Sequence, residues 1–308
     1  MSILVIGSFM MDLVVRTDRA PAAGETLIGE SFGRFPGGKG ANQAVAAARL
    51  GGEVTMAGKV GNDLFGDEFF AVLAENGVGT KHILRDDAAS TGVGSIVVEK
   101  SGQNRIIVVP GANLNFTQEE TDELEDVIRQ ADLLMMQLEM DMSVVERAAA
   151  IAAKHRVPVI LNPAPAAALS DQLLGNVTYL TPNETELALL SGMKVESIDD
   201  AKLAALSLLD RGVHNVVVTL AEKGALLCTP NGFQHVEGFP VEPVDTVAAG
   251  DSFNGALAVQ LVNGVTLAEA VRFANAVGAL TVTKQGAIPS LPRLEEVNSF
   301  MQMRLGSN

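Results

Sequence analysis

The feature that most constrains this chain is a regular alternation of short apolar segments with amphipathic ones over its second half. Strand-like runs at Leu133–Met136, Val157–Leu161 and Val177–Leu180 alternate with segments whose apolar residues recur at helical spacing. Strands that are apolar at every position have both faces buried, as in a parallel sheet covered by helices. The alternation therefore predicts an α/β fold with a mostly parallel central sheet.

Helical periodicity, capping residues and Gly or Pro punctuation place the other elements of this fold. The first strand is expected at Ser2–Gly7. Further strands are expected at Val54–Lys59, Val216–Leu220 and Ala225–Thr229, and helices at Lys39–Leu50, Leu64–Glu75, Val144–His155, Glu184–Leu190, Asp200–Arg211, Asp251–Val262, Leu267–Thr283 and Leu294–Met303.

Two β-prone segments with frequent glycine and proline, Leu13–Phe35 and Gly92–Gly111, break the alternation. The second contains the runs Val93–Glu99 and Arg105–Val109 around the turn sequence KSGQN, which predicts a hairpin. We expect both segments, approximately residues 13–35 and 92–111, to form a small antiparallel sheet that is a lid, a subunit contact or both. Because no linker divides the sequence, residues 1–308 are expected to form a single domain.

Composition argues against several classes of function. The 308 residues carry a formal net charge of −15, which disfavours a nucleic-acid or anionic-membrane surface. The one cysteine cannot form an internal disulfide, and charges break the apolar runs before they reach the roughly 18 residues of a membrane helix. The apolar N-terminus lacks the cationic region of a signal peptide, so a cytoplasmic protein is expected.

The segment PVDTVAAGDSFNGAL combines small residues with an acid at the start of a predicted helix. Ala248, Ala249 and Gly250 let a ligand approach the backbone, where the free N–H groups of a helix N-terminus attract an anion, phosphate above all. Asp251 can then take a proton from a hydroxyl that attacks the phosphate. The alternative interpretation is that Asp251 only caps the helix.

A second glycine-rich helix start, FPGGKGANQAVAA, places Lys39 and Asn42 at the mouth of a helix. Its spacing nearly matches a nucleotide-binding P-loop, but Gly40 stands where that motif needs Ser or Thr to hold Mg²⁺, which argues against a P-loop NTPase. One such turn alone is more often a tight bend than a ligand site. Two glycine-rich helix starts, one with an amide and one with an acid, favour a ligand site.

TPNETE at Thr181–Glu186 predicts a capping box, with Thr181 as N-cap and Glu184 at the third helical position. That interpretation leaves Asn183 and Glu186 free, and Glu186 can orient Mg²⁺ through water.

Two other polar segments follow apolar strands, at the edge where open α/β sheets bind ligands. Gln137 and Glu139 come shortly after Leu133–Met136, and the turn TLAEKGA at Thr219–Ala225 follows a later strand, where it can support a nucleotide.

In this order the motifs resemble the ribokinase branch of the PfkB carbohydrate kinase family over essentially the whole chain. The signatures GGKGANQ and DTVAAGDSF lie about 200 residues apart, and the other resembling blocks are GSFMMDLV, GNDLFG, MMQLE, NPAPA, TPNETE and TLAEKGA. The resemblance implies a three-layer α/β/α sandwich and a β-sheet lid that pairs two subunits into a homodimer. It also implies ATP-dependent phosphorylation of a furanose pentose on its 5-hydroxyl.

The resemblance implies roles for individual residues as well. Asp251 matches the base that deprotonates the sugar hydroxyl, and the amides of Ala248, Ala249 and Gly250 match the anion hole for the transferring phosphoryl group. The sugar contacts would be Met10, Asp12, Gly38, Lys39, Gly40, Asn42, Glu139 and Asp251. The nucleotide contacts would be Asn183, Thr219, Leu220, Ala221, Glu222, Lys223, Gly224, Gly250 and Asn275, with Glu186 as the acid that orders Mg²⁺.

A monovalent cation, usually K⁺, is implied by the VDT sequence of this branch. Asp245 would be its one charged ligand, and the cation would order the loop that holds the anion hole rather than touch the substrate. Carbonyls of neighbouring loops would complete the site, from Val247, Thr281, Lys284 and Gly286, with Ser290 as a further ligand.

Two positions depart from the pattern of the family. Met10 stands two residues before Asp12, where ribokinases usually carry Asn, so an amide partner for a sugar hydroxyl has become an apolar thioether. A buried hydroxyl without that partner costs about 1–3 kcal/mol, which favours 2-deoxy-D-ribose or a dual specificity. Deoxyribokinases resemble this pattern, with Met in the same place. Ala221 replaces a frequent glycine in the nucleotide turn.

Two other functions stay open at this point. A nucleoside kinase or another sugar kinase of the same family would use the same motifs with more room beyond the sugar. A non-catalytic sugar- or nucleotide-binding regulator belongs to another class, and such proteins tend to lose the base or the small residues, which this chain retains at Ala248–Asp251.

Overall fold

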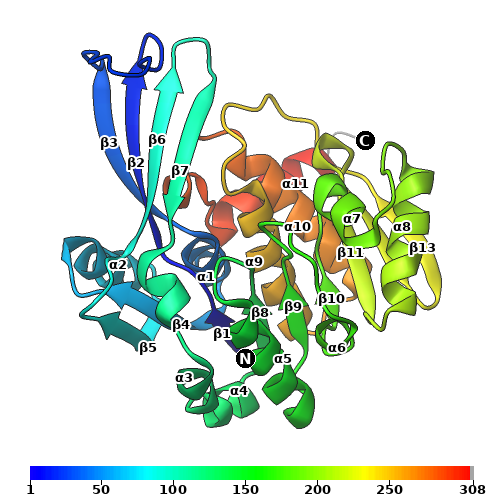
Figure 1. Ribbon diagram of the computed structural model, residues 1–308. Helices are drawn as coiled ribbons and strands as arrows, with labels where there is room; N and C mark the ends of the chain where they lie inside the picture. Colours follow the sequence, from blue (N-terminus) through cyan, green and yellow to red (C-terminus); the bar gives the residue numbers. More distant parts are fainter. Residues whose placement is uncertain (306–308) are drawn as a thin grey trace.

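The computed structural model describes residues 1–305, which form two separate β-sheets with helices around the larger one (Figure 1). The larger sheet has nine strands in the order β13-β12-β11-β10-β9-β8-β1-β4-β5, and every neighbouring pair from β11 to β5 is parallel. Its strands are β1 (Ser2–Ile6), β4 (Glu53–Gly61), β5 (Gly79–Asp86), β8 (Leu133–Met136), β9 (Val159–Leu161), β10 (Tyr179–Leu180), β11 (Asn215–Thr219), β12 (Ala225–Thr229) and β13 (Gly232–Val236).

Two hydrophobic cores lie on opposite faces of this sheet, which confirms the predicted α/β/α sandwich. Along β1, Ile3 and Val5 belong to one core and Leu4 and Ile6 to the other, because successive side chains of a strand point to opposite faces. The first core is covered by α1 (Lys39–Arg49), α2 (Leu64–Glu75), α9 (Ala249–Val262), α10 (Leu267–Thr281) and α11 (Leu294–Leu305). The second is covered by α3 (Gln118–Asp122), α4 (Glu125–Gln130), α5 (Met142–His155), α6 (Asp171–Leu174), α7 (Glu184–Ser191) and α8 (Ile198–Asp210).

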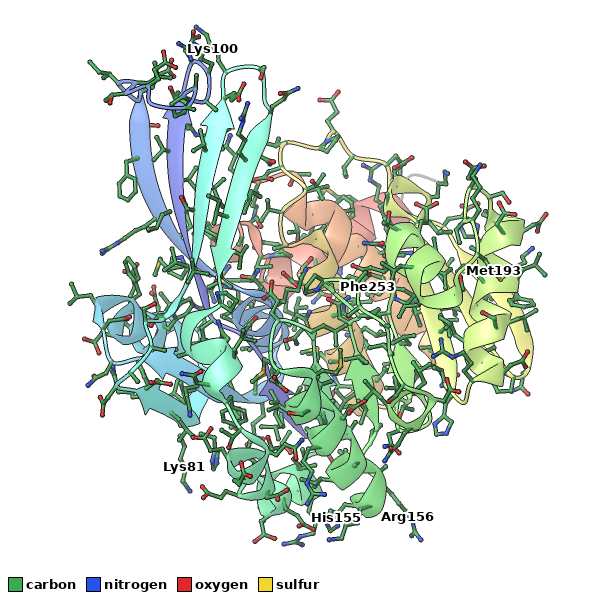
Figure 2. All side chains as sticks on the ribbon, in the orientation of Figure 1. Lys81, Lys100, His155, Arg156, Met193 and Phe253 are labelled. Atoms are coloured by element: carbon green, nitrogen blue, oxygen red, sulfur yellow. The ribbon has the colours of Figure 1, made fainter. Side chains whose placement is uncertain are left out.

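The smaller sheet contains four strands in the order β3-β2-β6-β7 and stands away from the main sheet (Figure 1). The predicted hairpin, β6 and β7, forms one half of this sheet, and Lys100 marks the hairpin tip in Figure 2. The prediction of an antiparallel sheet is wrong for the central pair, because β2 and β6 run parallel. Both hairpins leave the main sheet in the same direction, so their first strands meet side by side. The strands are β2 (Met10–Thr17), β3 (Ser31–Gly37), β6 (Gly92–Glu99) and β7 (Asn104–Val109).

Several elements give too weak a signal to be predicted from sequence. The edge strand β5 mixes exposed and partly buried positions, and β13 is exposed at all but its last residue, so neither shows an apolar run. The helices α3, α4 and α6 span only four to six residues each. Within residues 1–305, no helix has the length and apolar character needed to cross a membrane.

Candidate active site

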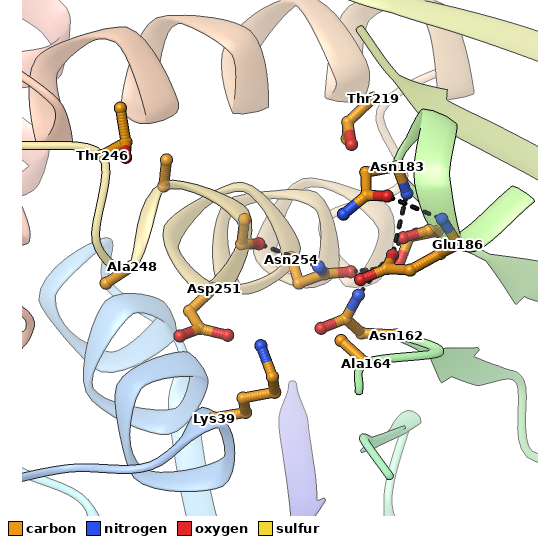
Figure 3. Close-up of a pocket in the computed structure, with 13 residues that line it drawn as sticks. Lys39, Asn162, Ala164, Asn183, Glu186, Thr219, Thr246, Ala248, Asp251 and Asn254 are labelled. Atoms are coloured by element: carbon orange, nitrogen blue, oxygen red, sulfur yellow. Dashed lines mark hydrogen bonds between the residues drawn. The ribbon is translucent and has the colours of Figure 1, made fainter. Parts of the chain in front are cut away.

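A pocket of about 200 Å³ opens where the N-termini of α1, α7 and α9 approach one another (Figure 3). Helix N-termini present unpaired N–H groups and the positive end of the helix dipole, so three of them facing one cavity favour an anionic ligand. The pocket is lined by Lys39, Asn162, Ala164, Thr181, Asn183, Glu186, Thr219, Thr246, Ala248, Ala249, Gly250, Asp251 and Asn254.

Asp251 lies in the first turn of α9 and is not the N-cap of that helix. The N-cap is Ala248, which has a left-handed backbone (φ 62°) and no capping side chain. Asp251 is 6 % exposed, and the first i−4 hydrogen bond into this helix runs from Ser252 N to Ala248 O at 2.8 Å. The N–H groups of Gly250 and Asp251 precede that bond, whereas Ala249 N donates a long bond of 3.4 Å to Thr246 O. The simple capping interpretation of Asp251 is therefore wrong.

Helix α1 brings the second glycine-rich motif against the same carboxylate. Its N-cap, Gly38, has φ 87°, and a Cβ there would lie 2.6 Å from Met10 N, so no other residue fits. Asn42 Nδ2 donates to Asp251 Oδ2 at 2.8 Å, while Asn42 Oδ1 is buried without a partner among the described residues. Lys39 extends its amine into the pocket beside Asp251 (Figure 3).

Two carboxylates, Glu139 and Asp12, lie near the N-terminus of α1 and are not among the residues that line the pocket. Glu139 Oε2 accepts hydrogen bonds from Lys39 N at 2.9 Å and from Ser8 Oγ, so it is fixed to the start of the helix. Asp12 is half-buried on β2, and burial, followed by the nearby Glu139 charge, raises the pKa of Asp12 to about 6. Such a pair of acceptors suits a ligand with several hydroxyl groups.

The capping of α7 differs from the prediction. Asn183 is the N-cap, and it forms a reciprocal capping box with Glu186, at 2.8 Å and 2.9 Å. The predicted box on Thr181 and Glu184 is wrong, because Thr181 still continues the strand, with its N–H bonded to Leu161 O. Asn183 and Glu186 are therefore bonded to each other, not free, and burial raises the pKa of Glu186.

The predicted nucleotide turn is present, but few of its residues reach the pocket. Thr219 lines the pocket, Leu220 is buried, and Glu222 and Lys223 are exposed. Ala221 has a left-handed backbone (φ 51°), the conformation that a glycine there would adopt freely. A Cβ on Gly224 would lie 2.2 Å from Val236 O, so that position requires glycine.

Asn275, the remaining residue matched to the nucleotide, is placed on α10 and is not among the pocket residues. Its Nδ2 donates to the carbonyls of Val236 and Glu237 at 3.1 and 3.2 Å, which ties α10 to the end of β13.

Asp245 joins the loop before α9 to the loop after α10. Its Oδ1 accepts from Val247 N at 3.1 Å, and its Oδ2 accepts from Gly286 N at 2.9 Å. Thr281 lies at the end of α10, and its hydroxyl donates to Ser252 Oγ at 2.8 Å, next to Asp251. Among residues 1–305, no three His, Cys, Asp or Glu side chains gather as a metal site.

Sequence reasoning missed five residues that line the pocket: Asn162, Ala164, Thr181, Thr246 and Asn254. The sequence contained a signal for three of these positions. The block NPAPA at 162–166 follows a strand and Asn254 lies near the start of a helix, where α/β folds bind ligands. Thr181 Oγ1 donates to Asn254 Oδ1 at 2.7 Å, and Asn254 Nδ2 donates to Gly250 O at 2.8 Å. These two bonds connect the segment after β10 to the first turn of α9.

Comparison with known proteins places this site in a family. The chain is 40% identical over 301 residues to a ribokinase from Haemophilus influenzae, with 98% of each chain covered. It is 39% identical over 304 residues to a deoxyribokinase from Salmonella typhi, covering 98% of this chain and 99% of the relative. The solved structure of Arabidopsis thaliana ribokinase complexed with ribose and ATP superposes with a TM-score of 0.94 at 33% identity, over 97% of this chain and 98% of that one.

The family assignment covers nearly the whole sequence. The sequence pattern of the pfkB family carbohydrate kinases matches residues 1–294, which include both glycine-rich helix starts and Asp251. The chain belongs to the pfkB family of carbohydrate kinases.

Proposed function

We propose that the protein is an ATP-dependent pentose kinase that transfers the γ-phosphate to the 5-hydroxyl of D-ribose or 2-deoxy-D-ribose. One observation carries the proposal: the buried Asp251 carboxylate lies in the first turn of α9 and lines a pocket where three helix N-termini meet. A carboxylate there can take the hydroxyl proton while the adjacent N–H groups stabilise charge on the phosphoryl group. The ribokinase and deoxyribokinase relatives support the choice of a pentose.

In this mechanism each residue takes the role that its position in the site allows. Asp251 acts as the base, and the amides of Ala248, Ala249 and Gly250 form the anion hole. Lys39, whose amine points into the pocket, adds a positive charge where phosphate oxygens would lie. The sugar would lie between Asp251 and the carboxylates beside α1, in contact with Met10, Asp12, Gly38, Lys39, Gly40, Asn42 and Glu139. The buried, unpaired Asn42 Oδ1 supports this placement, because it is free to accept a hydrogen bond from a sugar hydroxyl.

The nucleotide would bind at the opposite end of the pocket, against Asn183, Thr219 and the turn that follows. Glu186 offers carboxylate oxygens, which are suitable ligands for Mg²⁺ or for its bound waters. When bound, Mg²⁺ would neutralise charge on the phosphates. The chain's own contribution is to fix Glu186, through its capping box with Asn183, at the pocket wall.

K⁺ would bind beside Asp245, with carbonyls of Val247, Thr281, Lys284 and Gly286 and with Ser290. The oxygen-only set fits a hard monovalent cation. Asp245 already bonds to Val247 N and Gly286 N, so a cation at this place would act on the loop that presents Ala248.

The small sheet is proposed as a lid that also joins two subunits. The support is its exposed apolar surface: Phe32, Ile106, Ile107, Val108 and Val109 are each more than half exposed. Sedimentation equilibrium of the protein and of Ile107→Lys tests this, because a lid-mediated homodimer predicts that the charged variant is a monomer. The proposed reaction takes place in the cytoplasm.

The first experiment measures ADP release with ATP, Mg²⁺ and K⁺, and compares kcat/KM for D-ribose and 2-deoxy-D-ribose side by side. A phosphorus NMR spectrum of the product identifies the phosphorylated hydroxyl. Turnover of neither pentose would remove the pentose assignment, and a panel of nucleosides and hexoses would then test the other members of the family.

A further inference from the structure

We propose that Gln43 is a positioning residue for the base, a role that rests on the proposed kinase activity. Gln43 follows Asn42 on α1, is fully buried, and does not line the pocket. Its Nε2 lies 3.1 Å from Asp251 Oδ1 and 3.2 Å from Asn162 Oδ1, so both N–H bonds of the amide are used. Its Oε1 accepts a hydrogen bond from Gln137 Nε2 at 2.7 Å.

The charge of Asp251 fixes the orientation of this amide. If the Gln43 amide were rotated by half a turn, its oxygen would face the Asp251 carboxylate, which has no hydrogen to donate. That contact would be repulsive, so only the orientation with Nε2 toward Asp251 is stable. The side chain is locked by three partners on three different elements, α9, the end of β9 and the end of β8.

Asn42 and Gln43 hold the two oxygens of Asp251 in different ways. Asn42 bonds Oδ2 and has a buried, unpaired oxygen at the sugar end, so its side chain has to serve a ligand as well. Gln43 bonds Oδ1, and both N–H groups of its amide donate to partners inside the protein. Gln43 therefore keeps the plane of the carboxylate constant whether or not sugar is bound. The sugar hydroxyl must give its proton to the Asp251 carboxylate while its oxygen lies in line with the phosphoryl group. The orientation of the carboxylate therefore affects turnover more than substrate binding.

The test compares two glutamines that are buried equally well. Gln43→Met removes the bond to Asp251 with little change in volume. Gln137→Met is the matched control, since Gln137 is 1 % exposed and bonds Gln43 but not Asp251. We expect Gln43→Met to lower kcat about tenfold to a hundredfold, the range for one lost hydrogen bond to a charged group, with KM for sugar and ATP within about threefold. Gln137→Met should lower thermal stability similarly and kcat by less than about threefold.

Gln43→Leu provides a second variant if the methionine variant does not fold. Leucine has a similar volume and cannot donate a hydrogen bond to Asp251, so kcat should fall as far as in Gln43→Met. The proposal is overturned if kcat of the folded Gln43 variants stays within about twofold of the wild type, or if Gln137→Met loses as much kcat as Gln43→Met. If the wild type itself turns over no sugar, the proposed function fails instead, and this comparison identifies which of the two is wrong.

Discussion

Asn42 Nδ2 donates a 2.8 Å hydrogen bond to Asp251 Oδ2, across 209 positions of the sequence. The bond connects the two glycine-rich helix starts, which pack against each other on the same face of the main sheet. Small residues permit this approach: a Cβ on Gly255 of α9 would lie 2.8 Å from both Ala46 Cβ and Ala47 N of α1. One helix–helix contact therefore sets the relative position of the two glycine-rich helix starts in the site.

Replacing Asp251 by Asn should remove the base with little change in side-chain volume. Because a positioned general base contributes about 10²- to 10⁴-fold, we expect kcat to fall by that range while KM for ATP changes little. Asp200→Asn is the control, since Asp200 occupies the same third position of α8 and bonds only to its own capping segment. Steady-state kinetics of both variants make the comparison, and near-normal turnover of Asp251→Asn would refute the assignment of the base.

A pH-dependent gain in stability is expected at Asp12. Burial and Glu139 raise the pKa of Asp12 to about 6, so the folded chain holds this proton more tightly than the unfolded chain does. The ionised carboxylate therefore destabilises the fold above about pH 6, and the cost disappears as pH falls from about 6 to about 4. Asp12→Asn should be more stable than the wild type by about 2 kcal/mol at pH 8, with no difference near pH 4.

Urea unfolding of the wild type and Asp12→Asn at several pH values measures this difference directly. The same variant should bind sugar more weakly, because it loses a charged acceptor for hydroxyl groups. A difference in the free energy of unfolding that does not change between pH 8 and pH 4 would contradict the raised pKa.

The order and type of most elements could be predicted from the sequence, because apolar strands and capped helices carry strong local signals. The start of α9 and the acid at Asp251 were also predictable, since a glycine-rich turn before an amphipathic segment is a local pattern. The capping of α7 was not. TPNETE allows a box on Thr181 or on Asn183, and the choice depends on the pairing of Thr181 with β9, which local sequence does not contain.

The interior of the site depends on contacts between distant segments and could not be predicted. Gln43, Gln137 and Asn162 come from three segments. The sequence places Gln137 at the ligand-binding edge of the sheet, but it does not show that the three amides contact one another. Only the packing of α1 on the sheet and on α9 places their amides within hydrogen-bond distance of one another. The parallel pairing of β2 with β6 was missed for the same reason, because strand direction between two hairpins is a tertiary property.

Ala221 should be a site where glycine stabilises the protein. Its φ of 51° lies in the left-handed region, which costs a residue with a Cβ about 1–2 kcal/mol. Glycine removes this strain but lowers the stability by about 0.4–1 kcal/mol, because it makes the unfolded chain more flexible. Ala221→Gly should therefore raise the free energy of unfolding by about 0.5–1 kcal/mol. Ala150→Gly in the interior of α5 should instead lower it by about 1 kcal/mol. Denaturant unfolding of both variants would show whether the two changes have opposite signs.

Monovalent cations should change turnover through Asp245. We expect kcat of the wild type to be at least about tenfold higher in KCl than in tetramethylammonium chloride, because an ordered anion-hole loop stabilises the transferring phosphoryl group. Asp245→Asn should lose this dependence, since it removes the one charged ligand of the proposed site. Equal rates of the wild type in the two salts, at constant ionic strength, would remove K⁺ from the mechanism.

Met10 should determine which pentose is preferred. It is 6 % exposed at the start of β2, two residues before Asp12, so a sugar hydroxyl that faces it meets a thioether instead of an amide. An unpaired hydroxyl costs about 1–3 kcal/mol, which predicts a preference of the wild type for 2-deoxy-D-ribose of about tenfold or more in kcat/KM. Met10→Asn should shift the ratio towards D-ribose by a similar factor, and Met10→Leu, which stays apolar, should keep the preference for deoxyribose. If the wild type instead prefers D-ribose by tenfold or more, equal to about 1.4 kcal/mol at the transition state, other groups satisfy that hydroxyl and Met10 does not select the sugar.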